Sequence, residues 1–215
     1  MAFFPVFLEW EDVPCLIAGG GSVALHKAEL LCSQGADVTV VAPSVCPELQ
    51  ALPVRVLLRK VSKEDVSGQR LVVDATGDAE TALLLQKLCR EQRIPFNSAS
   101  RAEGGTAVFP AVYREGRTML AVSGLGASPA ASALLRDLLA EHIPACMDEI
   151  LDAMAALRTR SREAFDTQPL RSRFLHACLD EMMRRQRALR PEEVLQIQQG
   201  IKENPSGDGS TEKQL

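Results

Sequence analysis

Residues 13–44, VPCLIAGGGSVALHKAELLCSQGADVTVVAPS, decide the fold. The apolar run 13–18 predicts a buried strand, and it ends at three consecutive glycines. Apolar residues then follow at helical spacing over 22–33, and a β-branched run over 38–42 predicts a second strand. A strand, a glycine turn, a helix and a strand within about thirty residues have the length of a βαβ unit.

The turn in this unit, Gly19-Gly20-Gly21-Ser22-Val23-Ala24, fits the pattern G-x-G-x-x-A. The first glycine permits a tight turn, the second lets a pyrophosphate approach the backbone, and the alanine lets the helix pack on the sheet. Unpaired N–H groups at the helix start favour anionic phosphates. Because the pattern follows a strand and precedes a helix, it predicts a dinucleotide site. A tight βα turn without a ligand is the alternative.

The end of the second strand lacks the acidic residue that usually holds the ribose hydroxyls. The sequence there is Val41-Ala42-Pro43-Ser44, so Ser44 or backbone groups would have to hold the ribose. No arginine stands at this position to bind a 2′-phosphate. The segment therefore favours NAD over NADP.

Strands and helices continue to alternate along the next part of the chain. We expect strands over 54–58, 70–75 and 94–97 and a helix over 79–92. Such alternation predicts an α/β fold with a parallel sheet covered on both faces, doubly wound because crossovers are right-handed.

The pattern changes after Asn97. Residues 98–106 indicate a loop, 107–112 and 118–123 a strand pair, and 127–142 a helix with Ser128 as its N-cap. The chain is helical and Arg-rich from Pro144 onward. Its end is polar and contains Gly and Ser, which predicts a disordered tail. We expect a nucleotide-binding domain over 1–112, a middle segment over 113–145, a helical domain over 146–203 and the tail over 204–215.

Composition narrows the functional classes. The 215 residues carry a formal net charge of −4 and only 4% aromatic residues, which argues against nucleic-acid binding, including binding through the Arg-rich segment. The six cysteines and three histidines are scattered and predict no metal site. The start MAFFPVFLEW is not typical of a signal peptide, and no apolar run could span a bilayer. We expect a cytoplasmic protein with no membrane partner.

Three stretches resemble the precorrin-2 dehydrogenase / sirohydrochlorin ferrochelatase family, which includes the N-terminal part of siroheme synthases. They are FPVFLEWEDVPCLIAGGGSVALHKAELLCSQGADVTVVAP, LVVDATGDAETALLLQKLCRE and VFPAVYREGRTMLAVSGLGASPAASALLRDLL, at 4–43, 71–91 and 108–139. The resemblance implies a Rossmann domain, a middle segment that mediates homodimerisation and a C-terminal helical domain. It also implies NAD-dependent oxidation of precorrin-2 to sirohydrochlorin, and some members insert Fe²⁺ as well.

Site residues follow from the resemblance position by position. Four residues, Gly19, Gly21, Ser22 and Val23, match the family's pyrophosphate turn. Three more, Ala42, Pro43 and Ser44, match the segment near the adenosine ribose. The turn after the fourth strand, which lies near the cofactor in the family, matches Thr76, Gly77 and Asp78. Ser128 matches a serine at the tetrapyrrole cleft that is phosphorylated in some members.

The chain departs from the family after Asn97. The family has an aspartate there that is taken as the catalytic base, and this sequence has Ser100. A serine of ordinary acidity is not a general base at neutral pH. Three alternatives follow: the dehydrogenase works by positioning alone, Glu103 replaces the aspartate as the base, or activity is lost. Ferrochelatase activity and a catalytically weakened homologue that binds NAD or a tetrapyrrole are therefore the alternatives.

The substrate that the resemblance implies is a polycarboxylate, so positive charge must be concentrated locally on an acidic chain. Arginine suits carboxylates because its planar fork binds them in a bidentate way. Solvated helix faces are the alternative for any one arginine. The candidates are Arg101, Arg114, Arg117 and Arg136 in and after the loop, and Arg158, Arg160, Arg162, Arg171 and Arg173 in the helical part.

Overall fold

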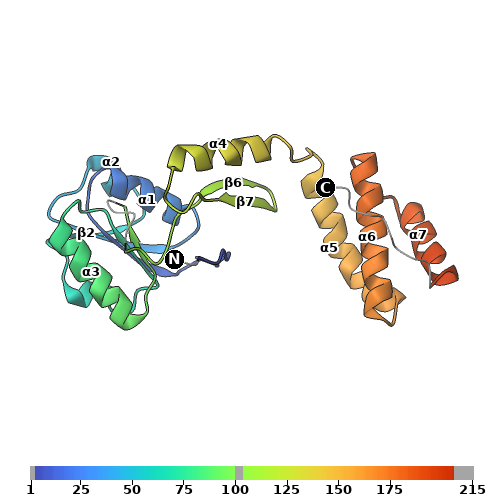
Figure 1. Ribbon diagram of the computed structural model, residues 1–215, viewed down its shortest axis with the longest axis horizontal. Coiled ribbons are helices and arrows are strands. Elements are labelled where there is room, and N and C mark those ends of the chain that lie inside the picture. Colours follow the sequence, from blue (N-terminus) through green and yellow to red (C-terminus); the bar gives the residue numbers. More distant parts are fainter. Residues whose placement is uncertain (1–2, 100–103, 206–215) are drawn as a thin grey trace. The chain divides into compact units, whose positions relative to one another are not determined.

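Strand β1 lies in the middle of a five-stranded parallel sheet with the order β3-β2-β1-β4-β5 (Figure 1). The computed structural model describes residues 3–99 and 104–205. The order confirms the predicted α/β fold with a doubly wound parallel sheet. The elements of this part are β1 (Pro14–Ala18), α1 (Ser22–Cys32), β2 (Asp37–Ala42), α2 (Pro47–Gln50), β3 (Arg55–Leu58), the short 3-10 helix η1 (Lys63–Val66), β4 (Leu71–Asp74), α3 (Ala79–Gln92) and β5 (Phe96–Ser98).

The strand order creates a switch point beside β1. Ala18, the last residue of β1, is in register with Val41 of β2 on one side and with Asp74 of β4 on the other. The chain runs from β1 to β2 in one direction and later returns to β4 in the other. In open α/β sheets, ligands bind outside the carboxyl ends of the strands at such a point.

Each face of the sheet has its own apolar core. On one face, Cys15, Ile17 and Val40 pack with Ala24 and Ala28 of α1. On the other face the side chains that alternate with these, such as Leu16 and Val72, pack with residues of α3 and η1. Because a strand turns successive side chains to opposite faces, a sheet covered on both sides needs continuous apolar strands. The runs CLIA and LVV meet that need.

The chain forms two compact units. The first contains residues up to Phe109 and also Leu125–Ala127, and the second contains Pro110–Gly124 and the chain from Ser128 onward. The second unit begins with the antiparallel pair β6 (Ala111–Glu115) and β7 (Thr118–Val122), followed by α4 (Pro129–Ala140).

The predicted strand 107–112 is displaced in the structure. The N–H groups of Thr106 and Ala107 donate to the carbonyl of Phe96 in the first unit, at 2.8 and 3.0 Å. Pro110 has no N–H to give to a ladder. The pairing with β7 therefore starts only at Ala111.

Three helices follow α4 in the described part of the second unit. They are α5 (Met147–Ala164), α6 (Gln168–Arg185) and α7 (Pro191–Glu203). Their common core includes Ile150, Phe174, Met182 and Val194. None of the helices in the described ranges has the length and apolar character needed to cross a membrane.

Candidate cofactor site

Gly19 forms the tight turn that leaves β1. Its φ is +121°, a conformation that favours glycine, and its N–H donates to the carbonyl of Val41 at 3.0 Å. A Cβ at this position would stand 2.6 Å from the carbonyl carbon of Ala75 and would overlap its oxygen. Gly19 therefore allows the turn after β1 to approach the end of β4.

Gly20 meets the loop after β2 in the same way. A Cβ there would overlap the carbonyl oxygen of Ser44 and stand 2.8 Å from the Cα of Val45. The carbonyl of Gly20 accepts the N–H of Cys46 at 2.8 Å. Gly20 is the variable position of the pattern G-x-G-x-x-A, so the sequence analysis did not predict a role for it. The run of three glycines was the signal that could have indicated one.

Gly21 faces open space and begins helix α1. A Cβ on it would have no described atom within 4 Å. Gly21 is the N-cap of α1, no side chain caps this helix start, and its first turn has no acidic residue. Ser22 and Val23 are exposed beside it. The first N–H groups of α1 and the positive end of its dipole are therefore arranged for an anion.

The segment that follows β2 also lies at the carboxyl edge of the sheet. Ala42 ends the strand, and Pro43 and Ser44 are exposed. Ala42 pairs in register with Leu58, the last residue of β3, so the residue after Leu58 lies just beyond the ends of both strands. That residue is Arg59.

Arg59 is held by a carboxylate. It donates to the two carboxylate oxygens of Asp65 at 2.7 and 2.5 Å. The hydrogen bonds from Arg59 lower the pKa of Asp65 to about 2, despite the opposing effect of burial. Asp65 thus directs the guanidinium towards η1.

The turn after β4 is built on a buried acid that sequence reasoning missed. Asp74 is fully buried, and one of its carboxylate oxygens accepts the N–H and the hydroxyl of Thr76 at 3.0 and 2.6 Å. The Thr76 hydroxyl in turn accepts the N–H of Asp78 at 3.1 Å. Gly77 has a φ of +72° and completes the turn.

Asp78 is the N-cap of α3. Its carboxylate accepts the N–H and hydroxyl of Thr81 at 2.9 and 2.6 Å, and these hydrogen bonds lower its pKa. The predicted residues Thr76, Gly77 and Asp78 therefore lie on one turn beside the glycine turn, since Ala75 contacts Gly19.

None of the three predicted catalytic residues belongs to the described residues of the first unit. Ser100 and Glu103 lie outside the described residues. The segment leading to them is tied to β4, because the N–H of Ala99 donates to the Asp74 carbonyl at 2.9 Å. Ser128 belongs to the second unit and caps α4, where its hydroxyl accepts the N–H of Ala131 at 3.1 Å.

Metal ligation has no visible counterpart in the described part of the chain. Within residues 3–99 and 104–205, no group of three or more His, Cys, Asp or Glu side chains could hold a metal ion.

Comparisons with known proteins identify a family match for this part of the chain. A family model described as "Putative NAD(P)-binding" matches residues 6–111, which include the whole glycine turn. The matched residues form a Rossmann-type sheet with an uncapped helix start at its switch point. This combination defines an NAD-binding protein.

Proteins similar to this chain narrow the class of NAD-binding protein. The chain is 35% identical to siroheme synthase from Thioalkalivibrio sulfidiphilus and 34% identical to siroheme synthase from Methylococcus capsulatus, over 84% of the chain in both cases. It spans 38% and 39% of those two proteins. A solved structure titled "SirC, precorrin-2 dehydrogenase" matches with a TM-score of 0.65 and 25% identity, over 94% of this chain and 100% of that one. The chain belongs to the precorrin-2 dehydrogenase / sirohydrochlorin ferrochelatase family.

Proposed function

We propose that the chain is an NAD-dependent precorrin-2 dehydrogenase, which oxidises precorrin-2 to sirohydrochlorin in siroheme biosynthesis. The observation that carries the proposal is the uncapped start of α1 at Gly21, beside two glycine contacts that admit no side chain. The likeness to a precorrin-2 dehydrogenase over the whole of that chain supports the choice of substrate.

The proposed oxidation balances with NAD⁺ as the oxidant. When bound, NAD⁺ accepts a hydride, so precorrin-2 and NAD⁺ give sirohydrochlorin, NADH and one proton. The chain's own contribution is to bind and orient. The N–H groups that follow Gly21 would hold the diphosphate, and Ser44 would face the adenosine ribose. The turn at Thr76 is fixed by Asp74 and forms the other side of the switch point.

We also propose three catalytic residues, Ser100, Glu103 and Ser128. If a base is needed, Glu103 is the carboxylate nearest along the chain to Ser100. Otherwise positioning beside the hydride acceptor carries the reaction, because desaturation extends conjugation in the product. The alternative, a sirohydrochlorin ferrochelatase or a weakened NAD- and tetrapyrrole-binding homologue, rests on Ser100 standing where the family has an aspartate. A cytoplasmic location is part of this proposal.

A homodimer is also part of this proposal. Four leucines on α4, in two adjacent helical columns, are between 46% and 61% exposed: Leu134, Leu135, Leu138 and Leu139. An apolar helix face of this kind is typical of a protein interface. The other side of α4 packs on β6 and β7, which leaves the leucine face for a second copy.

The direct test is turnover. Purified chain with enzymatically prepared precorrin-2 and NAD⁺ should form NADH and sirohydrochlorin in equal amounts, followed by their separate absorbance bands. The same mixture with Fe²⁺ distinguishes the ferrochelatase. NAD⁺ binding without any NADH formation would support the weakened homologue and contradict the dehydrogenase.

A further inference from the structure

The proposed oxidation releases a proton that a group beside the substrate must accept. Precorrin-2 loses two hydrogens in this reaction. One leaves as a hydride to NAD⁺, and the other leaves as a proton whose electron pair stays in the new double bond. A carboxylate within hydrogen-bond reach, directly or through one bridging group, suits this task at neutral pH.

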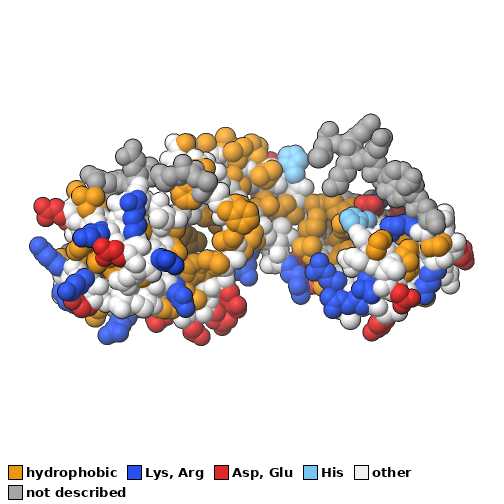
Figure 2. Space-filling view, turned by 60° about the horizontal axis from the view of Figure 1, so that its bottom comes forward, with side chains coloured by type: hydrophobic (Ala, Val, Ile, Leu, Met, Phe, Trp, Pro, Cys, Tyr) orange, Lys and Arg blue, Asp and Glu red, His pale blue; other side chains and the backbone are white. Residues whose placement is uncertain are grey.

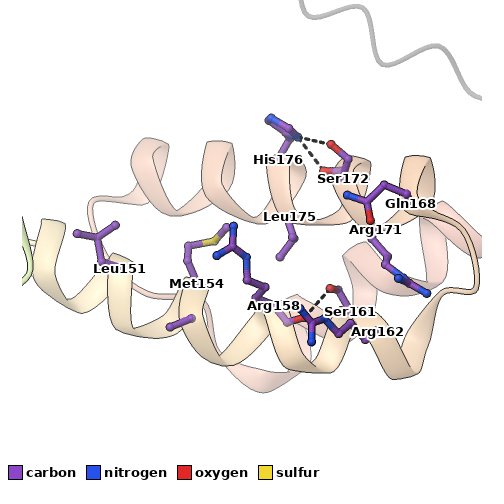
Figure 3. A pocket seen from close by; sticks show the side chains of 11 residues that line it. Leu151, Met154, Arg158, Ser161, Arg162, Gln168, Arg171, Ser172, Leu175 and His176 are labelled. Carbon is purple, nitrogen blue, oxygen red and sulfur yellow. Dashed lines mark hydrogen bonds between the residues drawn. The ribbon is translucent and has the colours of Figure 1, made fainter. Parts of the chain in front are cut away.

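Acidic side chains mostly lie at the surface, where Figure 2 shows several of them. Asp74 is the only Asp or Glu among residues 3–99 and 104–205 that is buried. The cavity of about 690 Å³ between α5 and α6 has arginines such as Arg158 and Arg162 in its lining, as Figure 3 shows, and no Asp or Glu. The buried carboxylate at the end of β4 is therefore the group to consider.

The two carboxylate oxygens of Asp74 have different surroundings. Oδ1 accepts the N–H and the hydroxyl of Thr76, at 3.0 and 2.6 Å. Oδ2 has one hydrogen-bond partner among the described residues, the hydroxyl of Ser98 at 3.5 Å. This distance is long for a hydrogen bond, and hydrogen bonds used in catalysis often shorten only when the substrate binds. Thr76 thus fixes the carboxylate and leaves Oδ2 able to take a proton.

Strand β5 brings Ser98 to this carboxylate. Ser98 is in register with Asp74, and the N–H of the next residue, Ala99, donates to the Asp74 carbonyl at 2.9 Å. Asp74 is fully buried, whereas Ser98 is only half-buried. A hydroxyl can accept one proton while it donates another. A proton therefore reaches Oδ2 of Asp74 through the Ser98 hydroxyl.

Asp78 is the other carboxylate on the same turn, and it is a poorer proton acceptor. Its carboxylate accepts the hydroxyl and the N–H of Thr81 at 2.6 and 2.9 Å. These hydrogen bonds lower the pKa of Asp78, so the side chain holds a proton less well than an ordinary aspartate.

We propose that Asp74 accepts the proton of the oxidation through the hydroxyl of Ser98. The choice of reaction rests on the proposed function. As the substrate proton binds to Oγ of Ser98, the O–H bond of Ser98 breaks and its proton binds to Oδ2 of Asp74, which becomes a neutral carboxyl group. Both residues lie at the carboxyl ends of β4 and β5, on the other side of β1 from the proposed adenosine position at Ser44. The nicotinamide half of a dinucleotide bound across the switch point would lie on that side.

Asp74→Asn separates the two roles of this side chain. The asparagine oxygen can keep both hydrogen bonds from Thr76, whereas its NH₂ group does not take up a proton. We expect kcat for NADH formation from precorrin-2 to fall by at least about 100-fold, with little change in KM. The control is Asp37→Asn, because Asp37 is an exposed acid at the start of β2, at the opposite edge of the sheet. Its kcat should match that of the wild type.

Variants of Ser98 test the bridging hydroxyl. Ser98→Ala removes it and should lower kcat. Ser98→Thr keeps the hydroxyl and should retain most of the wild-type kcat. Equal values of kcat in these two variants would overturn the proposal, and this comparison does not depend on the folding of Asp74→Asn.

A binding measurement tests the same placement without turnover. A carboxylate near the nicotinamide favours NAD⁺, whose ring is positively charged, over NADH, whose ring is neutral. Asp74→Asn should therefore lower the ratio of NAD⁺ affinity to NADH affinity by at least about threefold in calorimetric titrations, whereas Asp37→Asn should not. Denaturant melts should show that Asp74→Asn keeps the stability that Thr76→Val is expected to lose.

The outcomes separate this role from the proposed function. Turnover by the wild type with an unchanged kcat in Asp74→Asn, or an unchanged affinity ratio, overturns the proton acceptor and leaves the dehydrogenase standing. A loss of kcat in Glu103→Gln instead of Asp74→Asn assigns the proton to Glu103 and has the same consequence. A wild type that forms no NADH from precorrin-2 refutes the proposed function, and the proton-accepting role with it.

Discussion

The buried carboxylate of Asp74 accepts two hydrogen bonds from Thr76, one from the backbone N–H at 3.0 Å and one from the hydroxyl at 2.6 Å. A fully buried carboxylate needs such partners, because burial of an ionised group without them is costly. The pair fixes the turn whose first residue, Ala75, meets Gly19. One acid at the end of β4 therefore shapes both sides of the switch point.

Replacing Thr76 with Val should destabilise this turn. The variant removes the hydroxyl bond to Asp74, which we expect to lower the free energy of unfolding by about 1–3 kcal/mol and to weaken NAD⁺ binding. Thr76→Ser keeps the hydroxyl and serves as the control. Denaturant melts and NAD⁺ titrations check both effects. A Val variant as stable as the Ser variant would refute the role given to the hydroxyl.

Gly21→Asp should remove NAD⁺ binding while the fold persists. A side chain at residue 21 enters open space, so it creates no clash. Its carboxylate would face the diphosphate, and two like charges about 4 Å apart repel by about 4 kcal/mol near a protein surface. We expect a loss of at least about 100-fold in affinity by calorimetry. Gly21→Asn has the same shape without the charge and should lose far less. Equal losses in both variants would contradict the electrostatic account.

Asp65→Asn should relax the preference for NAD over NADP. The variant weakens the hydrogen bonds that hold Arg59, a residue that lies just beyond the paired ends of β2 and β3. The asparagine keeps a side-chain oxygen that can accept the Ser62 N–H. A released guanidinium can bind a 2′-phosphate. We expect NADP⁺ affinity to rise by about tenfold, with NAD⁺ affinity nearly unchanged. The neighbouring Glu64→Gln is the control. An unchanged ratio of the two dissociation constants in a folded Asp65→Asn protein would rule out this role.

The helical part should lose stability in acid through Glu193. Its carboxylate accepts bonds from Arg187 at 2.8 and 3.0 Å and from the Arg190 N–H at 2.7 Å. The bonds from Arg187 contribute most to lowering the pKa of Glu193 from its ordinary 4.5 to about 2. Because the folded-state pKa is the lower one, the stabilisation is complete above pH 4.5 and is lost as the pH falls towards 2.

Thermal melts of Glu193→Gln and the wild type between pH 7 and pH 2 test this dependence. The melting temperatures should differ above pH 4.5 and converge as the pH falls. Glu192→Gln, in the same first turn of α7, controls for the helix dipole. A difference that stays constant down to pH 2 would contradict the account.

Charges on the leucine face of α4 should separate the proposed dimer. Leu135→Glu/Leu139→Glu places two carboxylates one turn apart on an exposed face, so the isolated fold should tolerate them. Sedimentation should show a dimer for the wild type and a monomer for the variant. A wild-type monomer at micromolar concentration would refute the dimer.

The sheet was predictable because its signal is local. Apolar strands such as residues 13–18 and the glycine turn that follows are adjacent in sequence, and the parallel order follows from alternation with helices. The position of Gly19 and the open space at Gly21 follow from that geometry. The family resemblance added the neighbouring turn at Thr76.

The missed features depend on contacts between distant segments. Gly20 needs to be glycine because of the Ser44 carbonyl, and the turn that Asp74 holds lies beside the glycine turn because β4 pairs with β1. Arg59 lies just beyond the end of β2 only because β3 pairs with β2, with Ala42 in register with Leu58. Likewise, composition marked the arginines of the helical part, and packing of α5 on α6 decides which of them line a cavity.

The measurement that bears most directly on the account is a crystal structure of the chain with NAD⁺. It should show the diphosphate oxygens accepting hydrogen bonds from the backbone N–H groups that begin α1 after Gly21. A dinucleotide bound at another part of the chain, with that helix start in contact with solvent alone, would contradict it.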